Sequence, residues 1–192
     1  MTNNNYIFKR IFIITGIILN GIISGLFSQT PEEKSLFDRI NEHRISLGIG
    51  KLVWDSNAYN MATHHAKYIS IINSLPYDKK LLSHDEKFNI HDFEEMSFNE
   101  RCKKFITQKH ALIRENCAIH NIVSHFKSNK PTKPIDEILY EQWLTSKEGH
   151  KENMEAKESK KGACSIIHYM TPILLEGKIL QFECVIAVLD ID

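Results

Sequence analysis

The chain ends on two β-rich runs, 162–170 and 179–189, which are joined through Glu176-Gly177. Two such runs around a turn signal predict an antiparallel hairpin. The patterns before the hairpin are mostly helical, with one further strand pattern at Arg114–Asn121. Because helices come first and strands come last, the order predicts an α+β fold in which helices cover an antiparallel sheet.

Helix start signals define the segments that precede the hairpin. Thr30, Pro31 and Glu33 form a capping box with proline at the first helical position, and Ser97 with Glu100 forms a second capping box. The predicted helices run from Pro31 to about residue 47, from Asp55 or Ser56 to about Asn73, from Ser97 to Phe105, and onward from Pro134. The polar stretch 75–97 is predicted to be a long loop, and such loops often carry function.

The N-terminus has the pattern of an export signal. Lys9 and Arg10 precede the apolar run Ile11–Phe27, whose 17 residues would span roughly 25 Å as a helix, short of a ~30 Å hydrocarbon core. We therefore predict a signal peptide over residues 1–28, cleaved after Ser28, with an uncleaved N-terminal membrane anchor as the alternative. The mature protein would be secreted, periplasmic or extracellular.

Charge and length restrict the partners that the mature chain can take. Removing residues 1–28 leaves 192 − 28 = 164 residues with 22 basic and 24 acidic side chains, since the leader holds two basic residues and no acidic one. A balance near −2 offers no basic surface for nucleic acid. The length suits a single domain, which we place at residues 32–190 and expect to be a monomer.

Four motifs follow one another in a characteristic order. The first is a Trp-Asp pair that starts a helix with a His-His-Ala sequence, at Leu52-Val53-Trp54-Asp55 and 61–69. A Ser-His loop follows at Leu82-Ser83-His84-Asp85, and a Glu-Asn strand follows at Glu115-Asn116-Cys117-Ala118. The last is a Trp-x-x-Ser-x-x-Gly-His segment within Trp143–Met154. The series resembles the CAP superfamily, also called SCP/TAPS, and especially its short bacterial-type members.

The resemblance implies an α-β-α sandwich, with a small antiparallel sheet between helical layers, and a cleft lined by His and Glu side chains. Carried onto this sequence, the cleft residues are His84, Glu115 and His150. Animal members place a further Glu where this chain has Ser146. Glu148 and Glu152 lie nearby as candidates for that fourth position, and spacing does not choose between them.

The two cleft histidines are the candidate metal ligands. Neutral imidazoles with a carboxylate can hold Zn²⁺, whereas Ca²⁺ requires more oxygen ligands, so the possible cofactors are Zn²⁺ or Ca²⁺. His84 and His150 lie far apart in the sequence, so an interpretation without metal competes: His84 would cap a loop and His150 would tie the segment after Trp143 to the sheet. His65, on the predicted helix, is expected to be a buried structural residue.

The four cysteines allow two interpretations. Cys164 and Cys184 lie on the two strands of the predicted hairpin and could face each other as a disulfide, which would leave Cys102 and Cys117 as the second pair. The alternative is four small buried thiols.

The resemblance leaves three hypotheses for function, because the CAP fold does not fix an activity. The first is a secreted binding module for a small ligand, a lipid or a divalent metal, with a lipid, cell-wall or surface component as partner. The second is a metal-assisted hydrolase or protease in which Glu115 acts as base. The third is a structural envelope protein with a vestigial cleft. We expect binding rather than catalysis and assign no catalytic residue.

Overall fold

The computed structural model describes residues 29–75, 81–106, 113–122, 133–175 and 178–192, so the predicted leader lies outside the described residues. Within these ranges every helix is too short or too polar to span a bilayer. The elements in chain order are α2 (Pro31–Ser46), β1 (Val53–Trp54), α3 (Ser56–Ser74), α4 (Phe98–Phe105), β2 (Arg114–Ile122), α5 (Ile135–Thr145), α6 (His150–Met154), β3 (Lys161–Leu175) and β4 (Lys178–Ile191).

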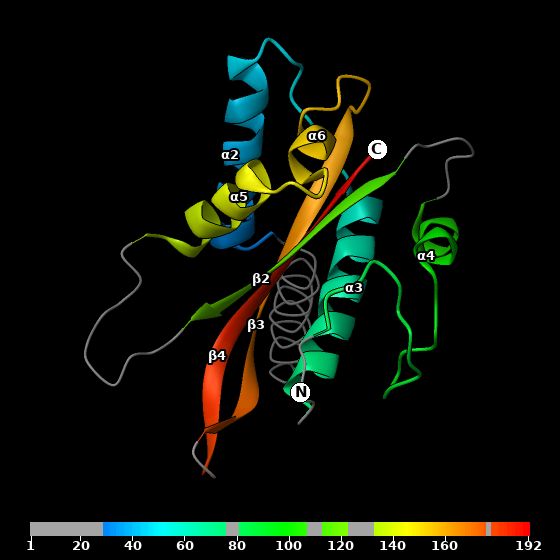
Figure 1. Ribbon diagram of the computed structural model, residues 1–192. Coiled ribbons are helices and arrows are strands. Elements are labelled where there is room, and N and C mark those ends of the chain that lie inside the picture. The colour runs from blue at the N-terminus through cyan, green and yellow to red at the C-terminus, as the bar shows by residue number, and fades with distance from the viewer. Residues whose placement is uncertain (1–28, 76–80, 107–112, 123–132, 176–177) are drawn as a thin grey trace, which may run out of the picture. The chain divides into compact units, whose positions relative to one another are not determined.

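The strands form one four-stranded sheet in the order β1-β3-β4-β2 (Figure 1). β3 and β4 make the predicted antiparallel hairpin, and β2 pairs antiparallel with β4 at one edge. At the other edge the short link at Val53–Trp54 pairs parallel with Lys161–Gly162, which makes the sheet mixed. Gly162 is required there, because a Cβ at this position would lie 2.8 Å from the Asp190 carbonyl oxygen.

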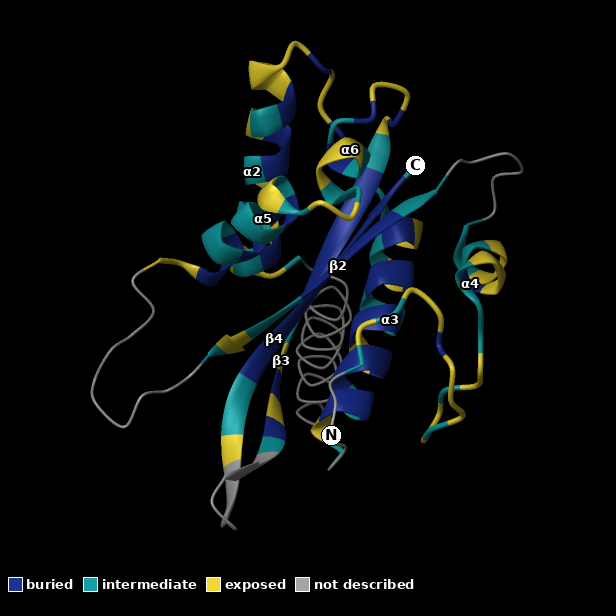
Figure 2. Cartoon of the chain, in the orientation of Figure 1, coloured by how far each residue is buried: buried dark blue, intermediate teal, exposed yellow. Residues whose placement is uncertain are grey.

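Helices cover both faces of the sheet, as the predicted sandwich requires. The side chains of β4 alternate between two hydrophobic clusters: Val185, Ala187 and Leu189 pack with α2, α5 and α6, while Ile186 and Val188 pack with α3. The central strands are therefore buried on both sides (Figure 2). β2 forms the open edge at which the two helical layers meet.

Two of the helix start signals in the sequence, those at Asp55 and Ser97, are confirmed by caps. The Asp55 side chain accepts from the backbone N–H groups of Asn57 and Ala58, and Ser97 and Glu100 form a complete capping box. Of the two tryptophans, Trp143 on α5 is fully buried, whereas Trp54 is only partly buried against the rings of Phe37 and Tyr59.

The predicted disulfides are wrong for this structure. The hairpin register pairs Cys164 with Leu189 and pairs Cys184 with Tyr169, so the two cysteines lie five residues out of register. All four cysteines, including Cys102 and Cys117, are free thiols, and three of the four are buried. The alternative of small buried thiols therefore holds for Cys117, Cys164 and Cys184, whereas Cys102 is partly exposed.

Candidate functional site

His84 lies on the segment between α3 and α4, which the fully buried His65 of α3 holds in place. Nδ1 of His65 is 3.1 Å from Glu86 Oε1, and Nε2 is 2.8 Å from the Ser83 carbonyl oxygen. Glu86 is itself buried, and its backbone pairs with that of Met96. The expected structural role of His65 is therefore to anchor the residues on both sides of His84.

Arg101 ties this segment to the sheet. The capping box at Ser97 starts α4 and directs the Arg101 side chain into the interior, where it is fully buried. One terminal nitrogen, Nη2, donates to Glu115 Oε2 at 2.6 Å and to the His84 carbonyl oxygen at 3.0 Å. The other, Nη1, lies 3.4 Å from Glu86 Oε1. One guanidinium thus bridges two buried carboxylates from different elements.

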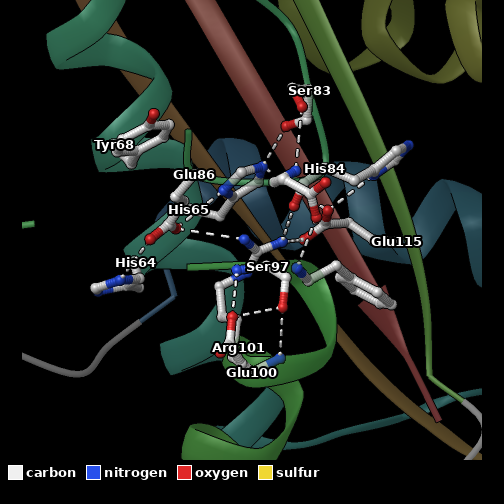
Figure 3. A network of polar contacts seen from close by, with 12 residues as sticks. His64, His65, Tyr68, Ser83, His84, Glu86, Ser97, Glu100, Arg101 and Glu115 are labelled. Atoms are coloured by element: carbon white, nitrogen blue, oxygen red, sulfur yellow. Dashed lines mark hydrogen bonds and ion pairs between the residues drawn. The ribbon is translucent and has the colours of Figure 1, made fainter. Parts of the chain in front are cut away.

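Glu115, on β2, connects this buried network to His84. Its Oε1 accepts from His84 Nδ1 at 2.9 Å, while the His84 side chain is 53% exposed and the Glu115 side chain is 1% exposed (Figure 3). Burial alone would raise the pKa of Glu115, but His65, His84 and Arg101 together lower it, so the group is a carboxylate. The hydrogen bond that His84 donates to Glu115 raises the pKa of His84.

His150 approaches the same place from the other helical layer. It begins α6 after Gly149, whose φ of 84° is a conformation that favours glycine. Asn116 Nδ2 donates to the His150 carbonyl oxygen at 2.8 Å, and Asn153 Nδ2 donates to Asn116 Oδ1 at 2.9 Å. Because Asn116 follows Glu115 on β2, these amides fix α6 beside the Glu115–His84 pair.

The imidazoles of His150 and His84 interact through charge. Burial lowers the pKa of His150, and the charge of His84 lowers it further, whereas Glu148 and Glu152 oppose the shift. The structure therefore joins His84 to Glu115 by a hydrogen bond and ties the His150 backbone to Asn116, the next residue of the edge strand β2.

Comparison with known proteins identifies the family of the chain. The model of the Cysteine-rich secretory protein family, CAP, matches residues 37–170, which is more than half of the chain and includes the three site residues. The chain belongs to the CAP family. Among solved structures it is similar to an outer surface protein from Borrelia burgdorferi, with 16% identity, a TM-score of 0.48, and 85% of this chain and 94% of that chain covered.

A second similar structure is an extracellular protein containing an SCP domain from Bacillus anthracis, with 17% identity and a TM-score of 0.48. The alignment covers 82% of this chain and 40% of that one, so this chain spans about two fifths of that protein's length. A search of curated proteins gave no match.

The fourth position of the CAP cleft remains without a direct carboxylate ligand among the described residues. Ser146 is the C-cap of α5, and its Oγ accepts from the Glu148 backbone N–H at 3.1 Å. Glu148 and Glu152 are both exposed and act on His150 through charge, and within the described ranges neither side chain is hydrogen-bonded to His84 or His150. Spacing did not choose between them, and the structure does not either.

An interior group of donor atoms lies behind the site in this CAP domain. His65, Glu115 and Cys117 each offer one atom within 4.8 Å of the others, which is close enough for one metal ion to contact all three. Their donors already have partners, however: both nitrogens of His65 face acceptors, and Arg101 holds Glu115. Burial raises the pKa of the Cys117 thiol well above its usual range, so it is not a thiolate. We assign no ion to this group.

Three buried charged residues of the site were not predicted from the sequence: Glu86, Arg101 and Asp190. The Ser97–Glu100 capping box predicted the helix that carries Arg101 but not its burial. Asp190 lies directly across from Glu115 in the β2–β4 register, and neither carboxyl oxygen has a donor among the described residues. Burial and the neighbouring Glu115 raise its pKa well above the usual range. The sequence signal available for Asp190 was an acidic residue that follows an apolar strand pattern.

Proposed function

We propose that this CAP domain is an exported binding module that holds a divalent cation between the imidazoles of His84 and His150. The hydrogen bond between His84 Nδ1 and the buried Glu115 carboxylate carries the proposal. A carboxylate only accepts, so Nδ1 bears the hydrogen and, in the neutral ring, Nε2 keeps its lone pair for a ligand. Histidines that bind metals are commonly oriented by a carboxylate in this way.

The donor types favour zinc over calcium. Two imidazole nitrogens suit Zn²⁺, which accepts three or four ligands of mixed type, whereas Ca²⁺ requires six or more oxygens. The buried Glu115 is engaged by His84 and Arg101, so it supports a ligand rather than supplying one. Glu148 and Glu152 are exposed on the His150 side and are the described carboxylates we would test as a further ligand.

The same geometry disfavours the hydrolase hypothesis with Glu115 as base. A general base needs an oxygen within reach of the proton it removes. Oε1 of Glu115 is occupied by His84, Oε2 is occupied by Arg101, and the side chain is nearly inaccessible to solvent. We therefore propose binding and not hydrolysis.

The proposed location outside the cell is supported by the names of similar proteins and by the leader pattern. The family is named for secretory proteins, and the two solved structures are described as an outer surface and an extracellular protein. Intact-mass measurement on protein from the envelope or the medium should show loss of residues 1–28. Full-length protein retained in the membrane fraction would contradict cleavage and support an anchor.

Titration calorimetry with Zn²⁺ at about pH 7.5 tests the binding site. We expect the parent to bind and His84→Ala and His150→Ala each to lose at least tenfold in affinity. His168→Ala is the matched control, because His168 is also a half-exposed histidine paired with carboxylates but lies elsewhere, between Glu32 and Glu183. A parent that does not bind zinc would overturn the proposal and make lipid or cell-wall binding the next function to test.

A further inference from the structure

We propose that Arg101 is a positioning residue for the His84 imidazole, acting both through Glu115 and through the backbone of His84. The inference rests on the proposed function of His84 as a ligand. It concerns how this chain presents that ligand, and its evidence is the set of buried contacts that Arg101 makes with His84, Glu115 and Glu86.

Arg101 holds His84 at two points with the same nitrogen. Its Nη2 donates to the His84 carbonyl oxygen at 3.0 Å and to Glu115 Oε2 at 2.6 Å. The other oxygen of that carboxylate, Oε1, accepts from the His84 ring. Arg101 therefore fixes where the His84 backbone lies and which way the carboxylate that orients its ring is turned.

A third contact of Arg101 leads to Ser83, the residue before His84. Nη1 of Arg101 lies 3.4 Å from Glu86 Oε1, and the same oxygen is 3.1 Å from His65 Nδ1. His65 Nε2 in turn donates to the Ser83 carbonyl oxygen. One guanidinium thus contacts the His84 backbone directly, reaches the His84 ring through Glu115, and reaches the Ser83 backbone through Glu86 and His65.

The planar guanidinium fork is what makes these contacts simultaneous. Its two terminal nitrogens point in fixed directions, which allows one side chain to reach both buried carboxylates and a carbonyl. Lysine carries one ammonium at the end of a flexible chain and cannot reproduce that geometry. Arg101→Lys is therefore a substitution that keeps the charge and removes the shape.

Arg44 provides a matched control on the opposite face of the sheet. It is also fully buried, but its guanidinium donates only to backbone carbonyl oxygens, those of Gly50, Met154, Ala156 and Ser159. Both arginines secure an irregular segment. Only Arg101 contacts a carboxylate that binds a candidate ligand, so a purely structural role predicts similar consequences for both.

The experiment compares the purified parent chain with Arg101→Lys, Arg101→Gln and Arg44→Lys. Zinc affinity is measured by calorimetry at about pH 8.5, two units above the ordinary pKa of imidazole, which reduces the competition between protons and zinc. The tautomer of the His84 ring is read from its ¹⁵N chemical shifts without metal, and thermal melting reports the fold.

We expect roughly a 10- to 100-fold loss of zinc affinity in Arg101→Gln, as for other residues that orient a metal ligand, and a smaller loss in Arg101→Lys. The Nδ1–H form of His84 should dominate in the parent and become mixed in both Arg101 variants. Arg44→Lys should lower the melting temperature while the affinity and the tautomer stay those of the parent. If Arg101→Gln does not fold, the zinc affinity and the His84 tautomer of Arg101→Lys decide whether Arg101 positions the ring.

Two results would overturn the inference: a folded Arg101 variant with the affinity and tautomer of the parent, or an Arg44→Lys variant with the same losses. A parent that ignores zinc would instead contradict the proposed function. In that case the tautomer comparison still tests whether Arg101 positions the ring.

Discussion

The two faces of the sheet are stabilised in different ways. On the α2, α5 and α6 face the core is apolar around Trp143 and Leu139, the buried Arg44 donates to neutral carbonyl groups, and one ion pair at its margin joins the buried Asp136 to the partly exposed Arg39. The α3 face is apolar toward Ile69 and Ile72, but its other end holds a buried network of carboxylates, imidazoles and a guanidinium. The candidate site lies at the strand edge beside that network.

The contrast indicates which face serves stability and which serves positioning. Well-packed apolar side chains stabilise a fold without needing individual partners, whereas a buried charge is tolerated only while its partner remains. Replacing a buried ionic group by apolar side chains is often neutral or stabilising in proteins. The presence of such a group beside His84 is therefore better explained by the orientation it imposes than by the stability it adds.

The largest expected effect is on the apolar face. Trp143→Ala should lower the free energy of unfolding by about 3–5 kcal/mol, because it removes a fully buried indole from the core. Urea denaturation measures the loss. Trp54→Ala is the control and should cost clearly less, since Trp54 is partly exposed. Equal losses for the two tryptophans would contradict the burial difference on which this ranking depends.

Acid should act first on the ionic face. Burial would raise the pKa of Glu86, but hydrogen bonds from His64 and His65 and the charge of Arg101 lower it from 4.5 to about 2. A carboxyl with a depressed pKa stabilises the fold above its unfolded pKa and loses that contribution as pH falls through the folded value. The parent should therefore lose about 3 kcal/mol between about pH 5 and pH 2 from this group.

Glu86→Gln tests that assignment. The variant should be less stable than the parent at neutral pH, and its free energy of unfolding should fall less steeply with acid over the same interval. The measurement is urea denaturation at a series of pH values. A variant with the same acid slope as the parent would show that other carboxyls govern acid unfolding.

Asp190 allows a prediction of opposite sign on the same face. Burial beside Glu115 raises its pKa, so folding at neutral pH requires the carboxyl to keep a proton that it would lose in the unfolded chain. Asp190→Asn keeps the shape without that requirement and should stabilise the protein at neutral pH. The gain should disappear below about pH 4, where the unfolded carboxyl is also protonated. A destabilised variant at pH 7 would contradict a protonated Asp190.

Zinc binding should depend on pH through His84. Its pKa is raised by Glu115, whereas that of His150 is lowered, so His84 is the ligand that must lose a proton first as zinc binds at neutral pH. Affinity should fall by up to about tenfold per pH unit once the pH is below the pKa of His84. Calorimetry from about pH 8 to pH 6 measures this, and a flat profile would exclude His84 as a ligand.

The ionic network also shows where sequence reasoning ends. Helix starts were predictable at Asp55 and Ser97 because caps are local, and the closing hairpin was predictable because strand alternation is local. The family motifs brought His84, Glu115 and His150 into one hypothesis. The disulfide between Cys164 and Cys184 failed because it depended on the register of the hairpin, which pairs Cys164 with Leu189 and Cys184 with Tyr169.

The roles of Arg101 and Asp190 lie beyond that limit. An arginine on a short polar helix is usually solvated, and nothing in the local sequence states that α4 packs its Arg101 between two carboxylates 14 and 15 residues away. Charge partners of this kind are set by tertiary packing, so they become visible only when the loop, the helix and the edge strand are placed together.

The smallest expected effect lies on the surface of the α2 side and contrasts His168 with His84. Burial would lower the pKa of His168, but hydrogen bonds with Glu32 and Glu183 outweigh it and raise the pKa. A raised pKa means that the stabilisation is complete below about pH 6.5 and is lost as pH rises through the folded value. Because the three side chains are 40–45% exposed, the contribution should stay below about 1 kcal/mol and weaken with salt.

Thermal melts of the parent and His168→Gln should therefore differ at about pH 5.5 and converge at about pH 8.5. Zinc affinity should be the same for both proteins throughout, since both ring nitrogens of His168 are already engaged by carboxylates. A loss of zinc affinity in His168→Gln would remove the distinction between the two imidazoles.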